Sequence, residues 1–281
     1  MYKIVRKEVL NSQVKLLEIE APYVARKAEP GQFIILRVDE DGERIPFTIA
    51  DYDREKGTVT IIFQEVGATT IRLGKMTEGD NLADFVGPLG VASHFEDVKK
   101  AAVIGGGLGV AIAYPQAKKL HSMGVSVDFI AGFRNKEILF LEKEMTAVSD
   151  RLFITTDDGS YGTKGFVSDV LKKLLDEGNE YDVVIAIGPP IMMKVVSEVT
   201  RPYGIKTIVS LNPIMIDGTG MCGGCRVTVG GETKFACVDG PDFDGHQVDF
   251  NELIRRLSMY KRDEKAAIER HQCRLEDQTN A

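Results

Sequence analysis

The sequence predicts a β-barrel plus α/β fold: an antiparallel barrel, then a doubly wound parallel sheet, then a small C-terminal cysteine-bearing module. Before about residue 98, short apolar runs are separated by turn signals, which is typical of a small barrel. From residue 99, apolar runs alternate with helical segments, which indicates a parallel sheet covered on both faces. Three of the four cysteines then fall between residues 222 and 237. We therefore expect a barrel over 1–98, an α/β domain over 99–212, a cofactor module over 213–247 and a charged helical tail over 248–281.

The barrel segment contains short apolar strands and one interrupting helix. The helix is expected at about Ala68–Lys75. The strands are expected at Lys3–Val9, Val14–Ile19, Gln32–Val38, Pro46–Ala50, Thr58–Val66 and Asn81–Val86.

The α/β segment begins with a continuous apolar run at residues 101–105, which predicts a strand buried on both faces. In the tail, Leu253, Ile254, Leu257 and Tyr260 share one helical face, which we expect to pack on the protein or on a partner. Later strands are expected at 125–131, 152–156, 182–188 and 206–211, and helices at 109–121, 138–148, 164–176 and 190–202.

Composition excludes several classes of function. The chain has 281 residues, of which 43% are hydrophobic, and a net charge of −7 from 35 basic and 42 acidic residues. An acidic chain is a poor nucleic-acid binder, because few cations can displace counterions. No apolar run reaches the ~20 residues that span a bilayer, and the N-terminus has no apolar secretion signal. We expect a cytoplasmic protein with reduced thiols.

The cysteines form the most specific motif in the chain. The pattern is Asp217-x4-Cys222-x2-Cys225-x11-Cys237. With Asp in place of the first Cys, this is the loop spacing that holds a [2Fe-2S] cluster in plant-type ferredoxins. A structural zinc is the alternative, with Cys273 as a fourth thiolate. A disulfide framework is not expected for four cysteines in a chain of this length.

Two motifs in the barrel have the composition of a flavin site. Arg44 can pair with a pyrophosphate, and the Thr48 hydroxyl can bond a flavin near N5, where hydride arrives. The alternative is an ordinary strand with Arg at its edge. Gly67 opens a helix that carries Thr69 and Thr70, and a helix N-terminus binds anions. The alternative there is a plain helix cap. The full flavin strand motif comprises Arg44, Pro46, Phe47, Thr48 and Ile49.

A glycine-dense loop follows the first α/β strand. Gly106, Gly107 and Gly109 lie between this strand and a helix, where a backbone can approach a pyrophosphate. Asp128 follows at the distance of a ribose-binding acid, but it falls in the middle of a strand, so we interpret it as structural. Gly188 is the first residue of a tight turn into the next predicted helix.

Acidic residues after the third parallel strand predict the nucleotide preference. Asp157 and Asp158 would accept hydrogen bonds from ribose hydroxyls and repel a 2′-phosphate, which favours NAD(H). The alternative is a surface acidic turn. Met192 lies one helical turn beyond Gly188, in a segment that by itself could be only a turn.

In this order the motifs resemble the ferredoxin-reductase superfamily, whose members have an R-x-[PY]-[FYS]-[ST] flavin strand, a G-x-x-T helix, a G-G-x-G loop and a G-P-x-x-M-M turn. The cysteine module is similar to that of the branch containing the dihydroorotate dehydrogenase electron-transfer subunit. Segments 212–227 and 235–241 most resemble small subunits of NADH-dependent reduced-ferredoxin:NADP oxidoreductases, also described as sulfide dehydrogenase subunits. Asp217 replaces the first Cys of the dihydroorotate type and points to this group.

The resemblance implies FAD on the barrel, with Thr48 beside its reactive ring and Gly67, Thr69 and Thr70 on its phosphates. It implies NAD(H) at the glycine loop, the acidic turn and the Gly188–Met192 turn. It also implies a larger partner flavoprotein with FAD, [4Fe-4S] clusters and an NADPH site, and electron bifurcation between them. Plant ferredoxin reductases have Cys where this chain has Ile187, so that residue's role does not carry over. The implied ligands of the [2Fe-2S] cluster are Asp217, Cys222, Cys225 and Cys237.

Two other functions stay open from the residues. The same fold could deliver electrons to a dihydroorotate dehydrogenase. It could also be a regulatory module that binds a nucleotide and senses redox state without turnover.

Overall fold

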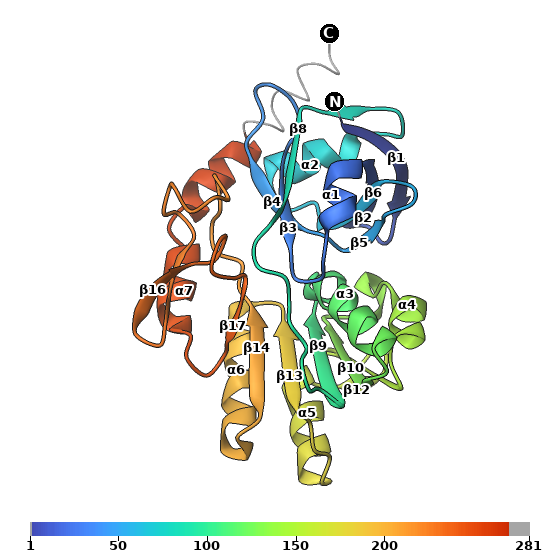
Figure 1. Cartoon of the computed structure of the whole chain (residues 1–281), viewed down its shortest axis with the longest axis vertical. Coiled ribbons are helices and arrows are strands. Elements are labelled where there is room, and N and C mark those ends of the chain that lie inside the picture. Colours follow the sequence, from blue (N-terminus) through green and yellow to red (C-terminus); the bar gives the residue numbers. More distant parts are fainter. Residues whose placement is uncertain (1, 270–281) are drawn as a thin grey trace.

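The computed structural model describes residues 2–269. It consists of a barrel-like part, an α/β part beneath it and a small module that lies along one side of both (Figure 1). Cys273, the alternative zinc ligand, lies outside the described residues, as does the end of the predicted tail.

The barrel-like part is built from two antiparallel sheets with strand orders β5-β6-β2-β1-β7 and β4-β3-β8. The predicted helix at Ala68–Lys75 is α2. A second, unpredicted helix, α1, begins with Pro22 and is too short to show a helical period. The elements are β1 (Tyr2–Val9), β2 (Val14–Glu20), α1 (Pro22–Lys27), β3 (Phe33–Arg37), β4 (Ile45–Thr48), β5 (Asp51–Asp53), β6 (Thr58–Gln64), α2 (Ala68–Lys75), β7 (Asn81–Leu82) and β8 (Asp84–Leu89).

The α/β part is a seven-stranded sheet with the order β12-β11-β10-β9-β13-β14-β17, parallel except for β17. This confirms the predicted doubly wound architecture. The predicted helix over 138–148 is instead a short 3-10 turn and a separate helix. The elements are β9 (Lys100–Gly106), α3 (Gly109–Ser122), β10 (Ser126–Phe133), η1 (Lys136–Ile138), α4 (Glu142–Ala147), β11 (Arg151–Thr156), β12 (Thr163–Lys164), α5 (Val167–Asp176), β13 (Val183–Ile187), α6 (Pro190–Thr200), η2 (Arg201–Tyr203) and β14 (Lys206–Ser210).

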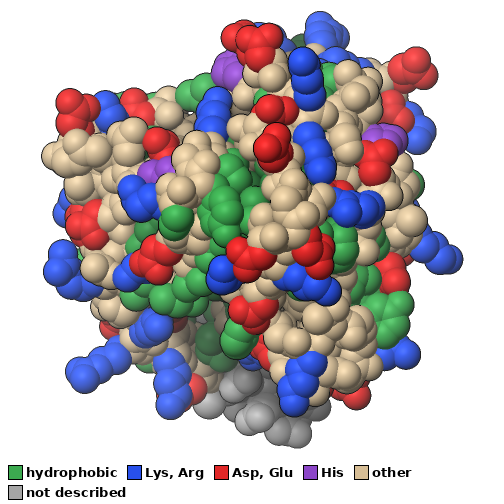
Figure 2. Space-filling model, turned by 90° about the horizontal axis from the view of Figure 1, so that it is seen from below, with side chains coloured by type: hydrophobic (Ala, Val, Ile, Leu, Met, Phe, Trp, Pro, Cys, Tyr) green, Lys and Arg blue, Asp and Glu red, His purple; other side chains and the backbone are tan. Residues whose placement is uncertain are grey.

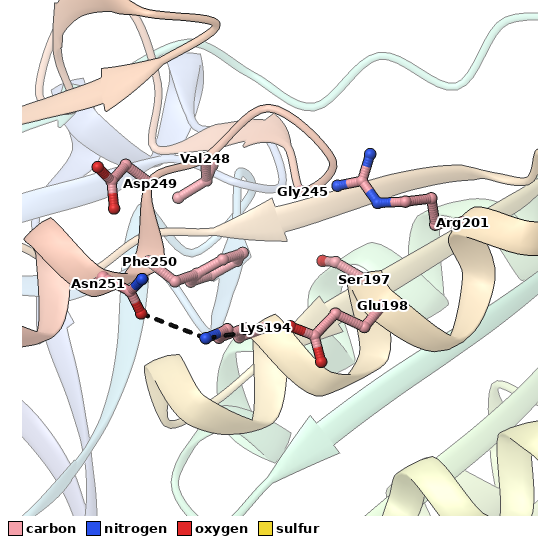
Figure 3. A pocket seen from close by; sticks show the side chains of 9 residues that line it. All are labelled: Lys194, Ser197, Glu198, Arg201, Gly245, Val248, Asp249, Phe250 and Asn251. Atoms are coloured by element: carbon pink, nitrogen blue, oxygen red, sulfur yellow. Dashed lines mark hydrogen bonds and ion pairs between the residues drawn. The ribbon is translucent and has the colours of Figure 1, made fainter.

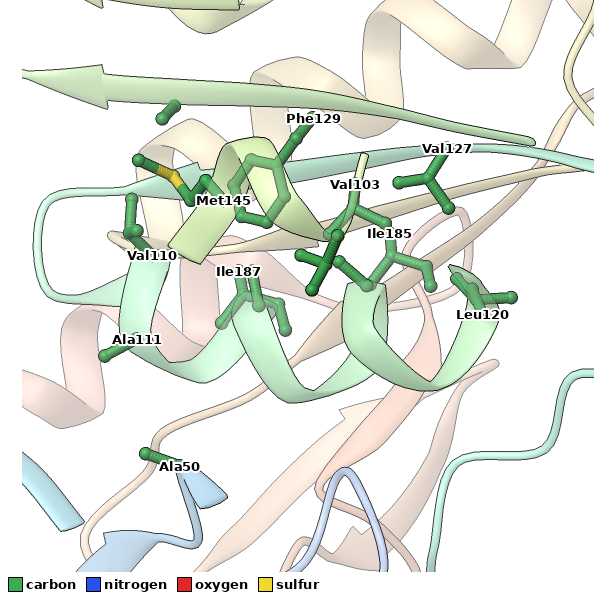
Figure 4. Close-up of a cluster of buried hydrophobic side chains, with 14 of the residues drawn as sticks. Ala50, Val103, Val110, Ala111, Leu120, Val127, Phe129, Met145, Ile185 and Ile187 are labelled. Atoms are coloured by element: carbon green, nitrogen blue, oxygen red, sulfur yellow. The ribbon is translucent and has the colours of Figure 1, made fainter. Parts of the chain in front are cut away.

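Both faces of this sheet are buried, as the continuous apolar run of β9 predicts. One face packs against α3. Figure 4 shows Val103, Val127 and Ile185 of the sheet gathered with Val110 and Leu120 of that helix. The other face packs against α5 and α6. Because successive side chains of a strand point to opposite faces, one strand supplies both cores.

The C-terminal module is a hairpin, an added strand and a helix. The hairpin turn has Gly230 and Gly231, both with positive φ, as a two-residue turn requires. Strand β17 pairs antiparallel with β14, so the module extends the α/β sheet across the predicted 212/213 boundary. The elements are β15 (Arg226–Val229), β16 (Glu232–Phe235), β17 (Asp242–Asp244) and α7 (Phe250–Leu257).

Helix α7 buries only part of the predicted face. Phe250 and Leu253 are buried in the core beside α6, whereas Ile254 is 38% exposed and Tyr260 50% exposed. Leu257 is partly buried against the same core. Docking on α6 selects positions i, i+3 and i+7 from Phe250, so Leu253 and Leu257 pack on the protein as expected, whereas Ile254 and Tyr260 do not pack on this core.

Two surface properties bear on the predicted classes of function. Within residues 2–269, no helix is long and apolar enough to cross a membrane. Figure 2 shows Lys and Arg interspersed with Asp and Glu over the face seen from below.

Candidate functional site

Strand β4, the predicted flavin strand, has all four side chains only half-buried, whereas its partner β3 is almost completely buried. Thr48 pairs with Phe33, and Pro46 pairs with Ile35. Ile49, just beyond the strand, is buried in the barrel core. The motif thus presents an accessible strand on a rigid support, which is what a bound ring system needs.

Arg44 lies at the meeting point of the barrel and the cysteine loop. Its Nε donates to the carbonyl oxygen of Ile216 at 3.2 Å. Its Nη2 lies 3.5 Å from the carbonyl oxygen of Asp217. These residues are more than 170 positions apart in the chain. The predicted flavin strand and the predicted metal loop are therefore tied directly to one another.

At the start of α2 the structure favours the capping interpretation for Thr70. Its Oγ1 accepts hydrogen bonds from the backbone N–H groups of Gly67 at 2.9 Å and Val66 at 3.0 Å. Thr69 instead donates its hydroxyl to the Glu43 carboxylate at 3.1 Å. A negative Glu43 opposes a phosphate at this point, so phosphate binding by Gly67, Thr69 and Thr70 remains a prediction.

The predicted nucleotide loops meet at the carboxyl ends of β9 and β13, where the strand order reverses and open α/β sheets bind ligands. A Cβ on Gly106 would lie 2.4 Å from Met192 Sδ, and one on Gly188 would lie 2.9 Å from Met192 Cε. A Cβ on Gly109 would lie 2.2 Å from the Ile187 carbonyl oxygen. These glycines and Met192 are thus brought into one close-packed group.

Gly107 differs from its neighbours. It has a φ of +54°, and no atom lies within 4 Å of the position its Cβ would take. Its loop conformation favours glycine, and its free side faces open space at the strand ends. Of the predicted glycines, this one leaves room for a nucleotide.

The acidic turn lies at the same edge of the sheet, two strands from β9. Asp158 accepts hydrogen bonds from the Ser160 hydroxyl at 2.6 Å and backbone N–H at 2.9 Å. These two bonds, the hydroxyl first, hold the pKa of Asp158 below its ordinary value. Asp157 is exposed. Both carboxylates are available at the rim, as a ribose contact requires.

Asp128 is part of the sheet interior, which confirms its interpretation as structural. Its carboxylate is buried, accepts from Arg151 Nε at 2.7 Å and accepts from the Tyr181 hydroxyl at 2.6 Å. Burial opposes ionisation, but these bonds outweigh it and hold the pKa of Asp128 below its usual range. It is not directed toward a ligand.

The cysteine loop packs on the flavin-strand sheet through β3. Cys225 and Cys237 are buried with Phe33 and Ile35 of β3, and their Sγ atoms lie 3.1 Å apart. A Cβ on Gly218 would lie 2.6 Å from Ile35 Cδ1, so the loop touches the strand closely. Two of the predicted metal ligands therefore pack on β3, the strand next to the predicted flavin strand.

The loop chemistry fits a cluster held by thiolates. The Gly224 N–H donates to Cys222 Sγ at 3.4 Å. This bond, followed by one from the Asp217 N–H, lowers the pKa of the exposed Cys222. Burial, then the Cys225 thiol, raises the pKa of Cys237 to about 12, so the Cys237 thiol would ionise only beside a cation such as iron.

Asp217 is an ionised side chain with one oxygen engaged. Its Oδ2 accepts from the Thr219 hydroxyl, from the Thr219 N–H at 2.9 Å and from the Met221 N–H at 3.2 Å. The Thr219 bonds lower its pKa. Within residues 2–269, however, no three His, Cys, Asp or Glu side chains converge into a complete metal site. The four-ligand set is therefore still a prediction.

The sequence interpretation missed Asp242, which joins three parts of the molecule. Its Oδ2 accepts from the Ser93 hydroxyl at 2.6 Å and from Gln116 Nε2 at 3.2 Å. Burial raises the pKa of this carboxyl. Its Oδ1 is buried and has no hydrogen-bond partner among the described residues. The only signal in the sequence was an acid after a Gly-Pro pair.

A pocket of about 150 Å³ lies between α6 and α7, away from the predicted cofactor residues. Figure 3 shows Lys194 reaching Asn251, with Nζ and Oδ1 at 3.2 Å. The pocket marks where α7 is fastened to the α/β part. It is lined by Lys194, Ser197, Glu198, Arg201, Gly245, Val248, Asp249, Phe250 and Asn251.

Residues 212–249 match the family model of the iron-sulfur cluster binding domain of dihydroorotate dehydrogenase B. The chain is 46% identical over 268 residues to a dihydroorotate dehydrogenase B (NAD(+)) electron transfer subunit homolog of Thermotoga maritima, covering 95% of this chain and 94% of that protein. It is 34% identical to the dihydroorotate dehydrogenase B (NAD(+)) electron transfer subunit of Geobacillus thermodenitrificans, covering 87% and 96%.

Among solved structures, the chain is similar to one of an NADH-dependent reduced ferredoxin-NADP oxidoreductase, described in connection with flavin-based electron bifurcation. The TM-score is 0.91 and the identity 45%, and the match covers 96% of this chain and 97% of that one. This likeness spans the barrel, the α/β part and the module together.

Proposed function

We propose, from the premise that the chain belongs to the family of dihydroorotate dehydrogenase B electron-transfer subunits and their homologues, that it is the small subunit of an electron-bifurcating NADH-dependent reduced-ferredoxin:NADP oxidoreductase. As such it is an oxidoreductase subunit. It exchanges hydride with NAD(H) and single electrons with a larger flavoprotein partner.

The observation that carries this proposal is that β3 contacts both the flavin strand and the cysteine loop. Phe33 pairs with Thr48 on the flavin strand and packs in the same cluster as Cys225 and Cys237. The nucleotide loops open at the carboxyl ends of β9 and β13. Contact between the flavin strand and the thiol loop within one chain that also carries nucleotide loops supports an electron-transfer subunit.

Each group of residues has a proposed task. Bound FAD converts a hydride into single electrons, and a [2Fe-2S] cluster passes them on. Thr48 positions the reactive edge of the flavin through its hydroxyl. Gly107 admits the nucleotide pyrophosphate. The flavin is held by Arg44, Pro46, Phe47, Thr48 and Ile49 with Gly67, Thr69 and Thr70, NAD(H) by Gly106, Gly107, Gly109, Asp157, Asp158, Gly188 and Met192, and the cluster by Asp217, Cys222, Cys225 and Cys237.

The partner belongs to the proposal as well. An electron-transfer subunit implies a second subunit that uses the electrons. We assign that subunit an FAD, [4Fe-4S] clusters and an NADPH site, and we place the complex in the cytoplasm, where thiols stay reduced.

A second candidate is electron delivery to a dihydroorotate dehydrogenase. It is favoured by the match of residues 212–249 to the cluster domain of that enzyme's subunit. Asp217 at the first ligand position argues for the first candidate. Co-purification separates the two, because the partner would be either a larger iron–sulfur flavoprotein or a dihydroorotate dehydrogenase.

The composition of the native complex tests the proposal. Anaerobically purified protein is expected to contain about one FAD, two irons and two sulfides per small subunit, in addition to the cofactors of its partner. Protein that carries zinc and no sulfide would overturn it. Reduction of an artificial dye by NADH with the isolated chain would distinguish an enzyme subunit from a regulatory nucleotide sensor.

The acidic turn predicts the nucleotide preference of this subunit. Replacing Asp157 and Asp158 together by Asn and Ser should improve the use of NADPH relative to NADH by roughly 10-fold or more, because like-charge repulsion of a 2′-phosphate is removed. The ratio of kcat/KM values for NADPH and NADH in dye reduction measures this. The matched control is Asp176→Asn on the exposed end of α5, which should leave the ratio unchanged. An unchanged ratio in the double variant would mean that this turn does not face the ribose.

A further inference from the structure

Two arginines outside the cysteine pattern bond to backbone carbonyls of the cysteine loop. Arg44, which precedes β4, donates to the carbonyl oxygen of Ile216 at 3.2 Å. Arg226, the first residue of β15, donates through Nη1 to the carbonyl oxygen of Gly223 at 3.0 Å. The two guanidinium groups therefore reach the loop from the barrel and from the module's own hairpin.

Both carbonyls belong to peptide groups whose N–H faces the same sulfur. The Gly223 carbonyl and the Gly224 N–H form one peptide group, and that N–H donates to Cys222 Sγ at 3.4 Å. The Ile216 carbonyl and the Asp217 N–H form another, and that N–H is the next backbone group after Gly224 that lowers the pKa of Cys222. Arg226 thus stands at the far end of a peptide group that donates to Cys222, and Arg44 at the far end of one that acts on the same thiol.

A positive group on a carbonyl oxygen polarises the peptide and strengthens the hydrogen bond that its N–H makes. Hydrogen bonds to the sulfurs of an iron–sulfur cluster are one of the determinants of its reduction potential. Stronger bonds to a ligand sulfur favour the reduced state, which carries one more negative charge. The effect matters here because Cys222 is the exposed cysteine of the loop.

We propose that Arg44 and Arg226 are positioning residues that raise the reduction potential of the cluster by polarising backbone peptide groups at the Cys222 sulfur. This rests on the proposed function, since it needs a [2Fe-2S] cluster in this loop. Arg44 thereby has a role in addition to its predicted contact with the flavin pyrophosphate.

A third arginine that bonds the cysteine loop can distinguish peptide polarisation from the through-space effect of a nearby positive charge. Arg256 of α7 donates through Nη2 to the carbonyl oxygen of Gly224 at 3.1 Å. The N–H of that peptide group belongs to Cys225, and it is not among the backbone groups that act on Cys222. Arg256 is therefore a matched control, with the same chemistry on the same loop but a different peptide group.

The test is the midpoint potential and the electron paramagnetic resonance spectrum of the reduced cluster in the full complex. Arg226→Gln should lower the potential and shift the spectrum with iron, sulfide and FAD content unchanged. Arg44→Gln should lower it in the same direction, and Arg226→Lys, which keeps a charged donor, should restore part of the shift. Arg256→Gln should give the smallest change of the three glutamine variants.

Two results would overturn the inference: an unchanged potential in Arg226→Gln, or a shift in Arg256→Gln as large as the other two, which would indicate through-space charge alone. Loss of FAD from Arg44→Gln with an unaltered cluster spectrum would count against the role of Arg44. A wild-type complex without iron and sulfide would instead contradict the proposed function itself, so the two failures are distinguishable.

Discussion

Cys237→Ala is expected to yield a protein that keeps its FAD but has lost the cluster. Cys237 is only 2% exposed and lies 3.1 Å from Cys225, sulfur to sulfur, at the centre of the loop's core. Loss of a partner beyond the ligand shell already lowers metal affinity about 10- to 100-fold, so loss of a ligand should cost at least about 100-fold. NADH-dependent dye reduction through the flavin should persist, while electron exchange with the partner should fall to background.

Iron and sulfide analysis, the visible spectrum and partner-dependent turnover measure this outcome. The matched control is Cys273→Ser, which should leave all three unchanged, because this cysteine is outside the ligand pattern. If Cys237→Ala retained the cluster spectrum, the predicted ligand set would be wrong. If Cys273→Ser lost the metal instead, the zinc alternative would need to be reconsidered.

Gly109→Ala is expected to destabilise the α/β part by about 3 kcal/mol, the upper range for overpacking. The new Cβ would lie 2.2 Å from the Ile187 carbonyl oxygen and 2.7 Å from Gly188 Cα. Both are backbone atoms that cannot move aside by rotation. Helix α3 would therefore be displaced from the turn between β13 and α6, and the nucleotide site would be distorted along with it. A lower Tm and a raised KM for NADH should appear together.

Gly107→Ala supplies the comparison within the same loop. Its Cβ would meet no atom within 4 Å, although its φ of +54° costs an alanine about 1 kcal/mol. We expect a small loss of stability but a clear rise in the KM for NADH, with FAD and cluster content unchanged. The prediction would fail if Gly107→Ala destabilised the protein more than Gly109→Ala, or if it left NADH binding untouched.

Much of the fold could be predicted from the sequence because the signals are local. The alternation of apolar runs and helical periods after residue 99 specifies parallel strands and covering helices, and β9 is buried on both faces as its apolar run predicts. Two of the errors were also local in origin. Helix α1 has six residues and no period, and the segment near 138–148 lacks a signal that separates η1 from α4.

Some residues of the candidate site could be identified from the sequence, whereas others could be interpreted only from the structure. The spacing of Cys222, Cys225 and Cys237 identified the loop, because ligands of one cluster lie close together in the chain. For Thr70 the sequence left two interpretations, a phosphate contact or a helix cap, and only its bonds to Gly67 and Val66 favour the cap. A threonine hydroxyl can form hydrogen bonds in either role, so the residue type alone does not distinguish a phosphate contact from a helix cap.

By itself, then, the sequence determined the order of the parts, the cysteine loop and the glycine loop, since each depends on residues that are neighbours in the chain. Only the tertiary structure decided that β3 places Phe33 between Thr48 and the cysteines, that Arg44 reaches Ile216, and that β17 joins the module to the α/β sheet. The physical reason is that these contacts arise when separately formed elements dock. Docking depends on the shapes of whole surfaces, and no short pattern of residues records it.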